Sequence, residues 1–127
     1  MTIIGIGIDI VEIKRIKNIL FRFGDKFVKK ILSENEYNKY YTCKQPIRFL
    51  SKKFAAKEAI SKSLGVGINN NIIFPHLIIN NDYLGKPFVK LFGAAKILAK
   101  TLQVNTIHIT LTDERKYVCA MVILEKL

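Results

Sequence analysis

The chain has 127 residues, of which 21 are Lys or Arg and 10 are Asp or Glu, so its formal net charge is +11. Half of the residues are hydrophobic, which excludes a disordered tail, and no apolar run is long enough to cross a bilayer. The first residues lack a signal-peptide pattern, and the two cysteines are too few for a disulfide framework. We therefore expect one cytoplasmic domain over residues 1–127, with a surface that attracts anionic partners or is simply well solvated.

The N-terminal residues 3–10 alternate in a way that predicts a buried β-strand. One face of this strand carries four isoleucines, which are Ile4, Ile6, Ile8 and Ile10. The other face carries Gly5, Gly7 and Asp9, and glycine in a strand often marks the close approach of a backbone or a ligand. Two interpretations follow. Either Asp9 caps the next segment and the glycines permit close packing, or Asp9 belongs to a functional site with space beside it.

Helical spacing follows this strand. Apolar residues recur on one face of a first helix that Gly24 is expected to end, namely Ile13, Ile16, Leu20 and Phe23. Ser33 and Glu36 have the spacing of a capping box, which predicts another helix start. A longer helix is expected after Pro46, with its end near Gly65.

The periodicity then changes from helix to strand. Residues 72–79 and 87–92 read as strands around a turn, and residues 93–103 read as a helix. Residues 106–112 and 117–125 read as an antiparallel hairpin. The sequence therefore predicts an α+β domain in which helices pack on an antiparallel sheet.

A second carboxylate stands out in the long helix. Glu58 and Lys62 are four residues apart, with Ser61 near the same face, and alanines at 55, 56 and 59 allow a close neighbour. One interpretation is a surface ion pair worth about 0.2–0.5 kcal/mol. If instead Glu58 converges with Asp9, the two carboxylates suit Mg²⁺, which binds carboxylates together with substrate phosphates. Lys62 would then face the same phosphates.

The residues also resemble a known family. "GIGIDIVEIKRI", "FAAKEAISKSLGVGI" and "GKP" are similar, in order and position, to the motifs of holo-acyl-carrier-protein synthases, the small 4′-phosphopantetheinyl transferases. The resemblance implies transfer of phosphopantetheine from coenzyme A to a serine of an acyl carrier protein, with adenosine 3′,5′-bisphosphate released, in support of fatty acid biosynthesis. It also implies the transferase fold and a homotrimer with sites between subunits.

The resemblance assigns roles to individual residues. Asp9 and Glu58 match magnesium ligands, and Lys62 matches a lysine that contacts the coenzyme phosphates. The positions that match the coenzyme pocket are Lys53, Ser61, Lys62, Gly65, Gly85, Lys86 and Pro87. Lys53 stands where many members have arginine, so a forked donor is replaced by a point charge. Lys14, Arg15 and Arg22 are expected to dock the acidic carrier, with Arg15 matching a basic residue of the family.

One position departs from the family. Many members carry histidine near the phosphates in the penultimate segment, whereas this chain has Asp113 there, and His108 is not its equivalent. Asp113 therefore either supports a metal-bound water or caps the turn.

The expected mechanism assigns Glu58 to remove the proton of the carrier serine and Lys62 to neutralise charge on the departing bisphosphate. A basic, non-catalytic nucleic-acid-binding module is the alternative. It leaves Asp9 and Glu58 unexplained and lacks interleaved exposed aromatics, so we expect neither a nucleic acid nor a membrane partner.

Overall fold

The computed structural model describes residues 1–66 and 71–127, which leaves the end of the "FAAKEAISKSLGVGI" motif outside the described residues. The elements run in chain order as β1 (Thr2–Glu12), α1 (Ile13–Phe23), α2 (Asp25–Ile31), α3 (Glu34–Thr42), α4 (Pro46–Ser63), a 3₁₀ turn η1 (Phe74–His76), β2 (Leu77–Asn81), β3 (Pro87–Leu91), α5 (Gly93–Thr101), β4 (Thr106–Asp113) and β5 (Tyr117–Lys126). The predicted α+β class is confirmed. No helix in the described ranges is long and apolar enough to cross a membrane.

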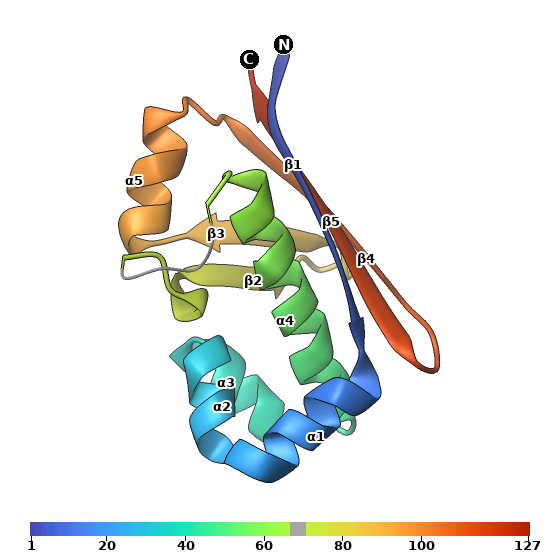
Figure 1. Ribbon diagram of the computed structural model, residues 1–127. Coiled ribbons are helices and arrows are strands. Elements are labelled where there is room, and N and C mark those ends of the chain that lie inside the picture. Colours follow the sequence, from blue (N-terminus) through green and yellow to red (C-terminus); the bar gives the residue numbers. More distant parts are fainter. Residues whose placement is uncertain (67–70) are drawn as a thin grey trace.

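The strands form two antiparallel sheets. The larger sheet has the order β1-β5-β4, so the first and last strands of the chain pair and the two termini lie together (Figure 1). The smaller sheet pairs β2 with β3. Helix α4 contacts β1, β5 and β2, and helices α1, α2 and α3 gather around its N-terminal half (Figure 1). This long helix is therefore the element against which the rest of the domain is assembled.

The glycine face of β1 lies directly against α4. A Cβ atom on Gly5 would overlap the carbonyl oxygen of Ser63, and one on Gly7 would overlap that of Ala59. The glycines thus permit close packing, and the space that we expected beside Asp9 is filled by helix backbone. The capping role is wrong, because α1 starts after Glu12 without a side-chain cap.

The isoleucine face of β1 is open in the single chain. Ile6, Ile8 and Ile10 are 59%, 57% and 64% exposed, whereas Ile4, next to a register shift, packs partly on the core. The expectation of a buried strand is therefore wrong for these three side chains. An apolar patch on a sheet face is typical of a surface that another chain covers.

Most predicted helix boundaries are confirmed. Gly24 ends α1 at φ 64°, and Ser33 and Glu36 form the predicted capping box of α3. Pro46 occupies the first turn of α4, and Gly65 follows its end at φ 78°. The expected strand over residues 72–79 is only partly right. Pro75 cannot donate to a strand ladder and lies in η1 instead.

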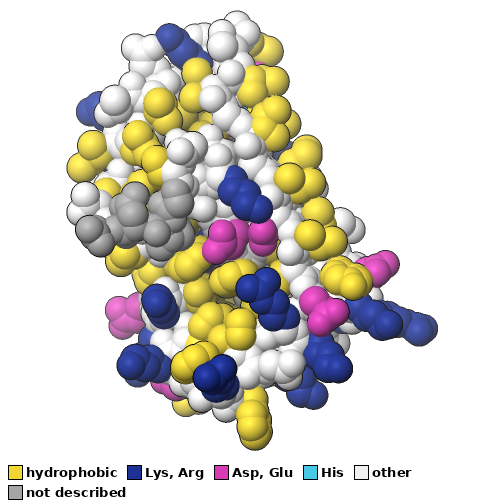
Figure 2. All heavy atoms as spheres, in the orientation of Figure 1, with side chains coloured by type: hydrophobic (Ala, Val, Ile, Leu, Met, Phe, Trp, Pro, Cys, Tyr) yellow, Lys and Arg dark blue, Asp and Glu magenta, His cyan; other side chains and the backbone are white. Residues whose placement is uncertain are grey.

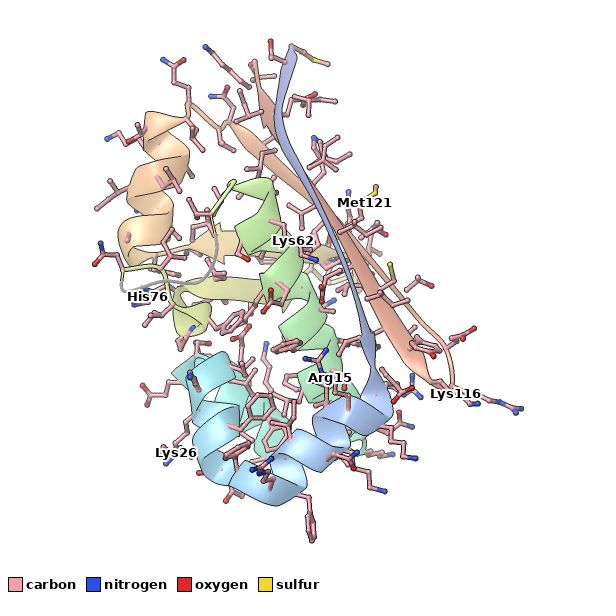
Figure 3. The ribbon with its side chains drawn as sticks, in the orientation of Figure 1. Arg15, Lys26, Lys62, His76, Lys116 and Met121 are labelled. Atoms are coloured by element: carbon pink, nitrogen blue, oxygen red, sulfur yellow. The ribbon has the colours of Figure 1, made fainter. Side chains whose placement is uncertain are left out.

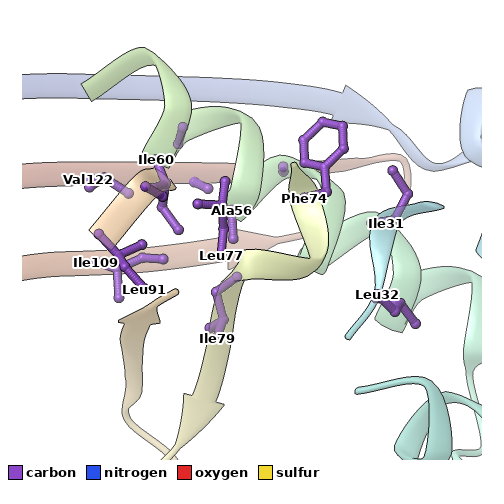
Figure 4. Close-up of a cluster of buried hydrophobic side chains, with 14 of the residues drawn as sticks. Ile31, Leu32, Ala56, Ile60, Phe74, Leu77, Ile79, Leu91, Ile109 and Val122 are labelled. Atoms are coloured by element: carbon purple, nitrogen blue, oxygen red, sulfur yellow. The ribbon is translucent and has the colours of Figure 1, made fainter. Parts of the chain in front are cut away.

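The core lies between α4 and the two sheets. Figure 4 shows Ala56 and Ile60 of α4 facing Val122 of the large sheet and Leu77 of the small one. All four side chains are no more than 1% exposed. The apolar face of α4 is thereby fixed, and the orientations of its polar side chains follow from it.

Candidate functional site

Asp9 and Lys62 meet on the face of α4 that packs against β1. The Lys62 Nζ lies 3.0 Å from Asp9 Oδ1 and donates to the Ile8 carbonyl oxygen at 2.9 Å. Asp9 is mostly buried, with its side chain 16% exposed, whereas that of Lys62 is 52% exposed. The ion pair of Lys62 is thus with Asp9 rather than with Glu58, which excludes the simple helical pair considered from the sequence.

Glu58 lies beside this pair. Its burial raises the pKa of the Glu58 carboxyl, and the nearby charge of Asp9 raises it further, while Lys62 and Arg15 act in the opposite direction. The structure therefore brings Asp9 and Glu58 together across nearly 50 residues of sequence. Figure 3 shows Lys62 and Arg15 on the same face, and Figure 2, in the same orientation, shows two adjacent acidic side chains between basic ones. We call Asp9, Arg15, Glu58 and Lys62 the Asp9 group.

The Asp9 group suits a hard divalent cation. Asp9 Oδ2 and both carboxylate oxygens of Glu58 accept no hydrogen bond from the residues that the structure describes. Two converging carboxylates with free oxygens match the preference of Mg²⁺ for oxygen ligands completed by water and phosphate. No cluster of three or more His, Cys, Asp or Glu side chains occurs within residues 1–66 and 71–127, so a metal here would need ligands from solvent or substrate.

Other predicted residues line a separate cavity of about 330 Å³. Its walls are formed by Phe49, Lys52, Lys53, Asn81, Gly85, Pro87, Thr110, Leu111 and Asp113. We call it the Lys53 cavity. Lys86 lines an adjoining hollow of about 630 Å³ that shares Pro87. No member of the Asp9 group lines either hollow, so within one chain the predicted site residues form two groups.

Lys53 is held firmly in the wall of its cavity. Its Nζ donates to the Ile79 carbonyl oxygen at 2.6 Å, lies 3.9 Å from Glu36 Oε2 and sits 5.2 Å from the centre of the Phe49 ring. Burial lowers the pKa of Lys53 to about 8, although the charge of Glu36 opposes that shift. The cavity therefore has a cation that loses its charge as the pH rises through about 8.

The turn that carries "GKP" is built from local hydrogen bonds. Asp82 Oδ1 accepts from the backbone N–H groups of Leu84 and Lys86, and Gly85 has φ 84°, which favours glycine. This geometry explains the glycine at position 85 and presents Gly85 and Pro87 to the cavity.

Asp113 forms ion pairs with the first half of α4. Its Oδ2 accepts from Arg48 Nη1 at 2.7 Å, and its Oδ1 lies 3.4 Å from Lys52 Nζ. The Arg48 guanidinium holds the pKa of the Asp113 carboxyl below its usual range. The turn-cap interpretation does not describe these contacts, because the partners of Asp113 are side chains of a distant helix.

The remaining predicted pocket residues lie at the end of α4. Ser61 is buried, and its hydroxyl donates to the Glu58 carbonyl oxygen of its own helix. Gly65 is exposed just beyond the helix. The Ser61 hydroxyl is thus bonded to the backbone of its own helix, one turn from Glu58.

A buried ionic network was missed by the sequence interpretation. Lys57 is fully buried, and its Nζ donates to Glu36 Oε1 at 2.6 Å and to the carbonyl oxygens of Ile31 and Phe74. Glu36 also accepts from the backbone N–H groups of Ser33 and Ile79. The signal was present, because Lys53, Lys57 and Ile60 continue the apolar stripe of α4 at helical spacing. We call Glu36, Lys53 and Lys57 the Glu36 network.

The predicted carrier-docking residues lie on α1. Lys14, Arg15 and Arg22 are all exposed, but only Arg15 also belongs to the Asp9 group. Near Arg22, a groove of about 320 Å³ runs between α1 and α2, lined by Ile19, Phe23, Lys26, Phe27 and Lys30. Its apolar floor and basic rim suit an acidic amphipathic helix.

Comparison with known proteins agrees with these features. Residues 5–122 match the family described as the 4′-phosphopantetheinyl transferase superfamily. The chain is 51% identical over 126 residues to a holo-[acyl-carrier-protein] synthase of Photorhabdus laumondii, covering 99% of this chain and 100% of that one. It resembles the crystal structure of the synthase of Neisseria meningitidis with a TM-score of 0.94 and 35% identity, covering 98% and 100% of the two chains. A Bacillus anthracis synthase in complex with coenzyme A (3′,5′-ADP) matches with a TM-score of 0.83 and 34% identity over the whole of both chains.

Proposed function

Because the chain belongs to the 4′-phosphopantetheinyl transferase superfamily, as a holo-acyl-carrier-protein synthase, we propose that it modifies an acyl carrier protein with the arm of coenzyme A. The serine hydroxyl of the carrier attacks the β-phosphorus of coenzyme A. The pyrophosphate bond breaks, phosphopantetheine stays on the serine, and adenosine 3′,5′-bisphosphate leaves. The product would serve fatty acid biosynthesis in the cytoplasm.

The observation that carries this proposal is the convergence of Asp9, Glu58 and Lys62. Asp9 and Glu58 would hold Mg²⁺, which, when bound, neutralises charge on the pyrophosphate. Glu58, whose carboxylate oxygens accept no hydrogen bond from the described residues, would accept the proton of the serine, directly or through a metal-bound water. The exposed Lys62 ammonium offers positive charge to the departing bisphosphate.

The coenzyme would be held by residues of both groups. Lys53, Gly85 and Pro87 line one cavity, Lys86 lines the adjoining hollow, and Ser61, Lys62 and Gly65 lie towards the end of α4. Because the Lys53 cavity and the Asp9 group are separate within one chain, a complete site would combine one group from each of two subunits.

A homotrimer would supply that combination. The exposed Ile6, Ile8 and Ile10 of β1 give each chain an apolar sheet face for a neighbour to cover. Sedimentation at micromolar concentration should give a mass near three times 14.5 kDa. A stable and active monomer would exclude shared sites.

The carrier would dock on the basic surface of α1. Acyl carrier proteins of this kind are acidic helical proteins, and a chain with net charge +11 attracts them at long range. Lys14 and Arg22 would contact acidic side chains, and Arg15, beside Glu58, would guide the carrier serine to the reacting phosphate.

The deciding experiment is a transfer assay with purified components. The chain is incubated with coenzyme A, Mg²⁺ and an apo acyl carrier protein, and the carrier is weighed by mass spectrometry. A gain of one phosphopantetheine, absent without Mg²⁺ and restored by adding it, supports both reaction and metal. An unmodified carrier, with the enzyme shown to be folded, would overturn the proposed function.

A further inference from the structure

Arg48, in the first turns of α4, binds three consecutive residues at the end of β4 and in the turn that follows. Its Nη1 donates to Asp113 Oδ2 at 2.7 Å and to the Glu114 carbonyl oxygen at 2.7 Å, and its Nη2 donates to the Arg115 carbonyl oxygen at 3.4 Å. These residues lie 65 to 67 positions further along the chain. The planar guanidinium is suited to such a fork of acceptors, whereas a lysine would present a single point charge.

The Arg48 contacts reach the Lys53 cavity through Asp113. Asp113 and Lys52, which lie 3.4 Å apart, both line that cavity, and Arg48 does not. The Asp113 carboxylate would repel a phosphate if it stood alone. Together with Arg48 and Lys52, Asp113 forms a cluster with a net charge of one positive unit, which does not repel a phosphate.

The opposite side of the turn is held by different bonds. The Lys116 carbonyl oxygen accepts from the backbone N–H of Ile13 at 2.8 Å, and the N–H of Glu114 donates to the Tyr117 carbonyl oxygen at 2.9 Å. These bonds fix the turn to the start of α1 and close the hairpin. Arg48 thus makes the hydrogen bonds that connect the cavity side of the hairpin to α4, and Lys52 adds an ion pair to Asp113.

We propose that Arg48 is a positioning residue for coenzyme binding, which holds Asp113 and the β4–β5 turn so that Lys52 and the end of β4 form the wall of the Lys53 cavity. This inference rests on the proposed function. The competing role is direct: Arg48 would leave Asp113 and contact a coenzyme phosphate itself. The two roles make opposite predictions for Asp113.

The test measures coenzyme A affinity by titration calorimetry for the full-length chain. The variants are Arg48→Met, Arg48→Lys, Asp113→Asn and the double variant Arg48→Met/Asp113→Asn. Lys100→Met is the matched control, because it removes one positive charge from the exposed face of α5. Turnover with saturating coenzyme A and apo carrier is measured beside affinity, and each value is referred to the folded fraction from a thermal melt.

The positioning role predicts that Arg48→Met weakens coenzyme A binding at least fivefold and changes kcat by less than twofold. Asp113→Asn should also weaken binding, by at least twofold, because the ion pairs of Asp113 with Arg48 and Lys52 are lost. The double variant should bind no worse than Arg48→Met alone, since both changes break the same connection. Arg48→Lys should recover less than half of the loss, and Lys100→Met should match the unmodified chain.

Three results would overturn the inference. Unchanged affinity in Arg48→Met removes any role in coenzyme binding, and tighter binding in Asp113→Asn favours the direct role. Full recovery by Arg48→Lys shows that charge alone matters. If Arg48→Met fails to fold, Arg48→Lys and Asp113→Asn still decide between the roles. Failure of the unmodified chain to modify any carrier would refute the proposed function instead.

Discussion

Helix α4 contributes lysines to two clusters of carboxylate and lysine, the Glu36 network and the Asp9 group, which differ in how completely their hydrogen bonds are made. In the Glu36 network, Lys57 uses all three ammonium protons on Glu36, Ile31 and Phe74, and its side chain is fully buried. In the Asp9 group, Lys62 is half exposed, and Glu58 accepts no hydrogen bond through its carboxylate from the residues that the structure describes. The same residue types therefore have different environments in the two clusters, buried and fully bonded in one and partly open to solvent in the other.

Hydrogen bonding and exposure together distinguish charged groups that stabilise the fold from those that are free to react. A buried ion pair whose donors and acceptors are all satisfied has no capacity left for a substrate, and removing one partner leaves an uncompensated charge. A partly exposed group with free oxygens can still bind a cation or accept a proton. Four measurements test this distinction.

The strongest test removes the Lys57 ammonium. Lys57→Met leaves Glu36 buried without its main counter-charge and should lower the free energy of unfolding by about 3–5 kcal/mol. Urea denaturation followed by circular dichroism measures the loss. A change below 1 kcal/mol would show that the Glu36 network does not support the fold.

The second test removes the carboxylates of the Asp9 group. Asp9→Ala and Glu58→Ala should each reduce turnover at least a hundredfold, about 2.7 kcal/mol of barrier, while the melting temperature stays close to that of the unmodified chain. Steady-state carrier modification at saturating Mg²⁺ measures the rate. Glu34→Ala, which removes an exposed carboxylate of α3, is the control. Full activity in either variant would contradict a two-carboxylate site.

The third test uses Lys53, which belongs to the Glu36 network and also faces a cavity. Its pKa of about 8 in the free chain means that the ammonium is present below that pH and is lost as the pH rises. An anionic coenzyme binds the charged form better, so its affinity should fall about tenfold between pH 7 and pH 9. Calorimetry at both values measures this.

Lys53→Arg provides the control for that pH effect. The guanidinium remains charged at both pH values, so the variant should bind coenzyme A about equally at pH 7 and pH 9. An equal pH dependence in this variant would assign the effect to another group.

The smallest effect on activity is expected from an exposed charge that forms no ion pair within the described residues. Arg22 makes no ion pair within the described residues, and Arg22→Glu should raise the KM for the carrier about threefold without changing coenzyme A affinity. The effect should shrink above 0.1 M salt, where the Debye length is about 10 Å. Arg22 is chosen over Arg15 because Arg15 also acts on Glu58. If the KM for the carrier changes neither in Arg22→Glu nor with salt, the docking surface lies elsewhere.

Much of the fold could be predicted because local rules determine it. The capping box of Ser33 and Glu36, the stop at Gly24 and the hairpin before Tyr117 follow from residue type and spacing. From the sequence, the proximity of Asp9 and Glu58 is only one of two interpretations. It depends on α4 lying against the glycine face of β1, which is a tertiary contact.

The partners of the charged side chains could not be predicted from the sequence. Glu36 was recognised as a capping residue, but its second carboxylate oxygen binds Ile79, 43 positions away. The partner of Asp113 is Arg48, 65 positions earlier in the chain, so the spacing around Asp113 could suggest only a metal-bound water or a turn. Local spacing carries no information on such distant pairs.

The pairing of β1 with β5 bears on when the enzyme becomes competent during synthesis. In the sheet order β1-β5-β4, the strand that carries Asp9 has its hydrogen-bonded neighbour in residues 117–126, near the opposite end of the chain. While a ribosome still holds that segment in its exit tunnel, β1 has no strand to pair with. A nascent chain should therefore remain inactive until residues 117–126 have left the exit tunnel, and coenzyme A would be consumed only after that point.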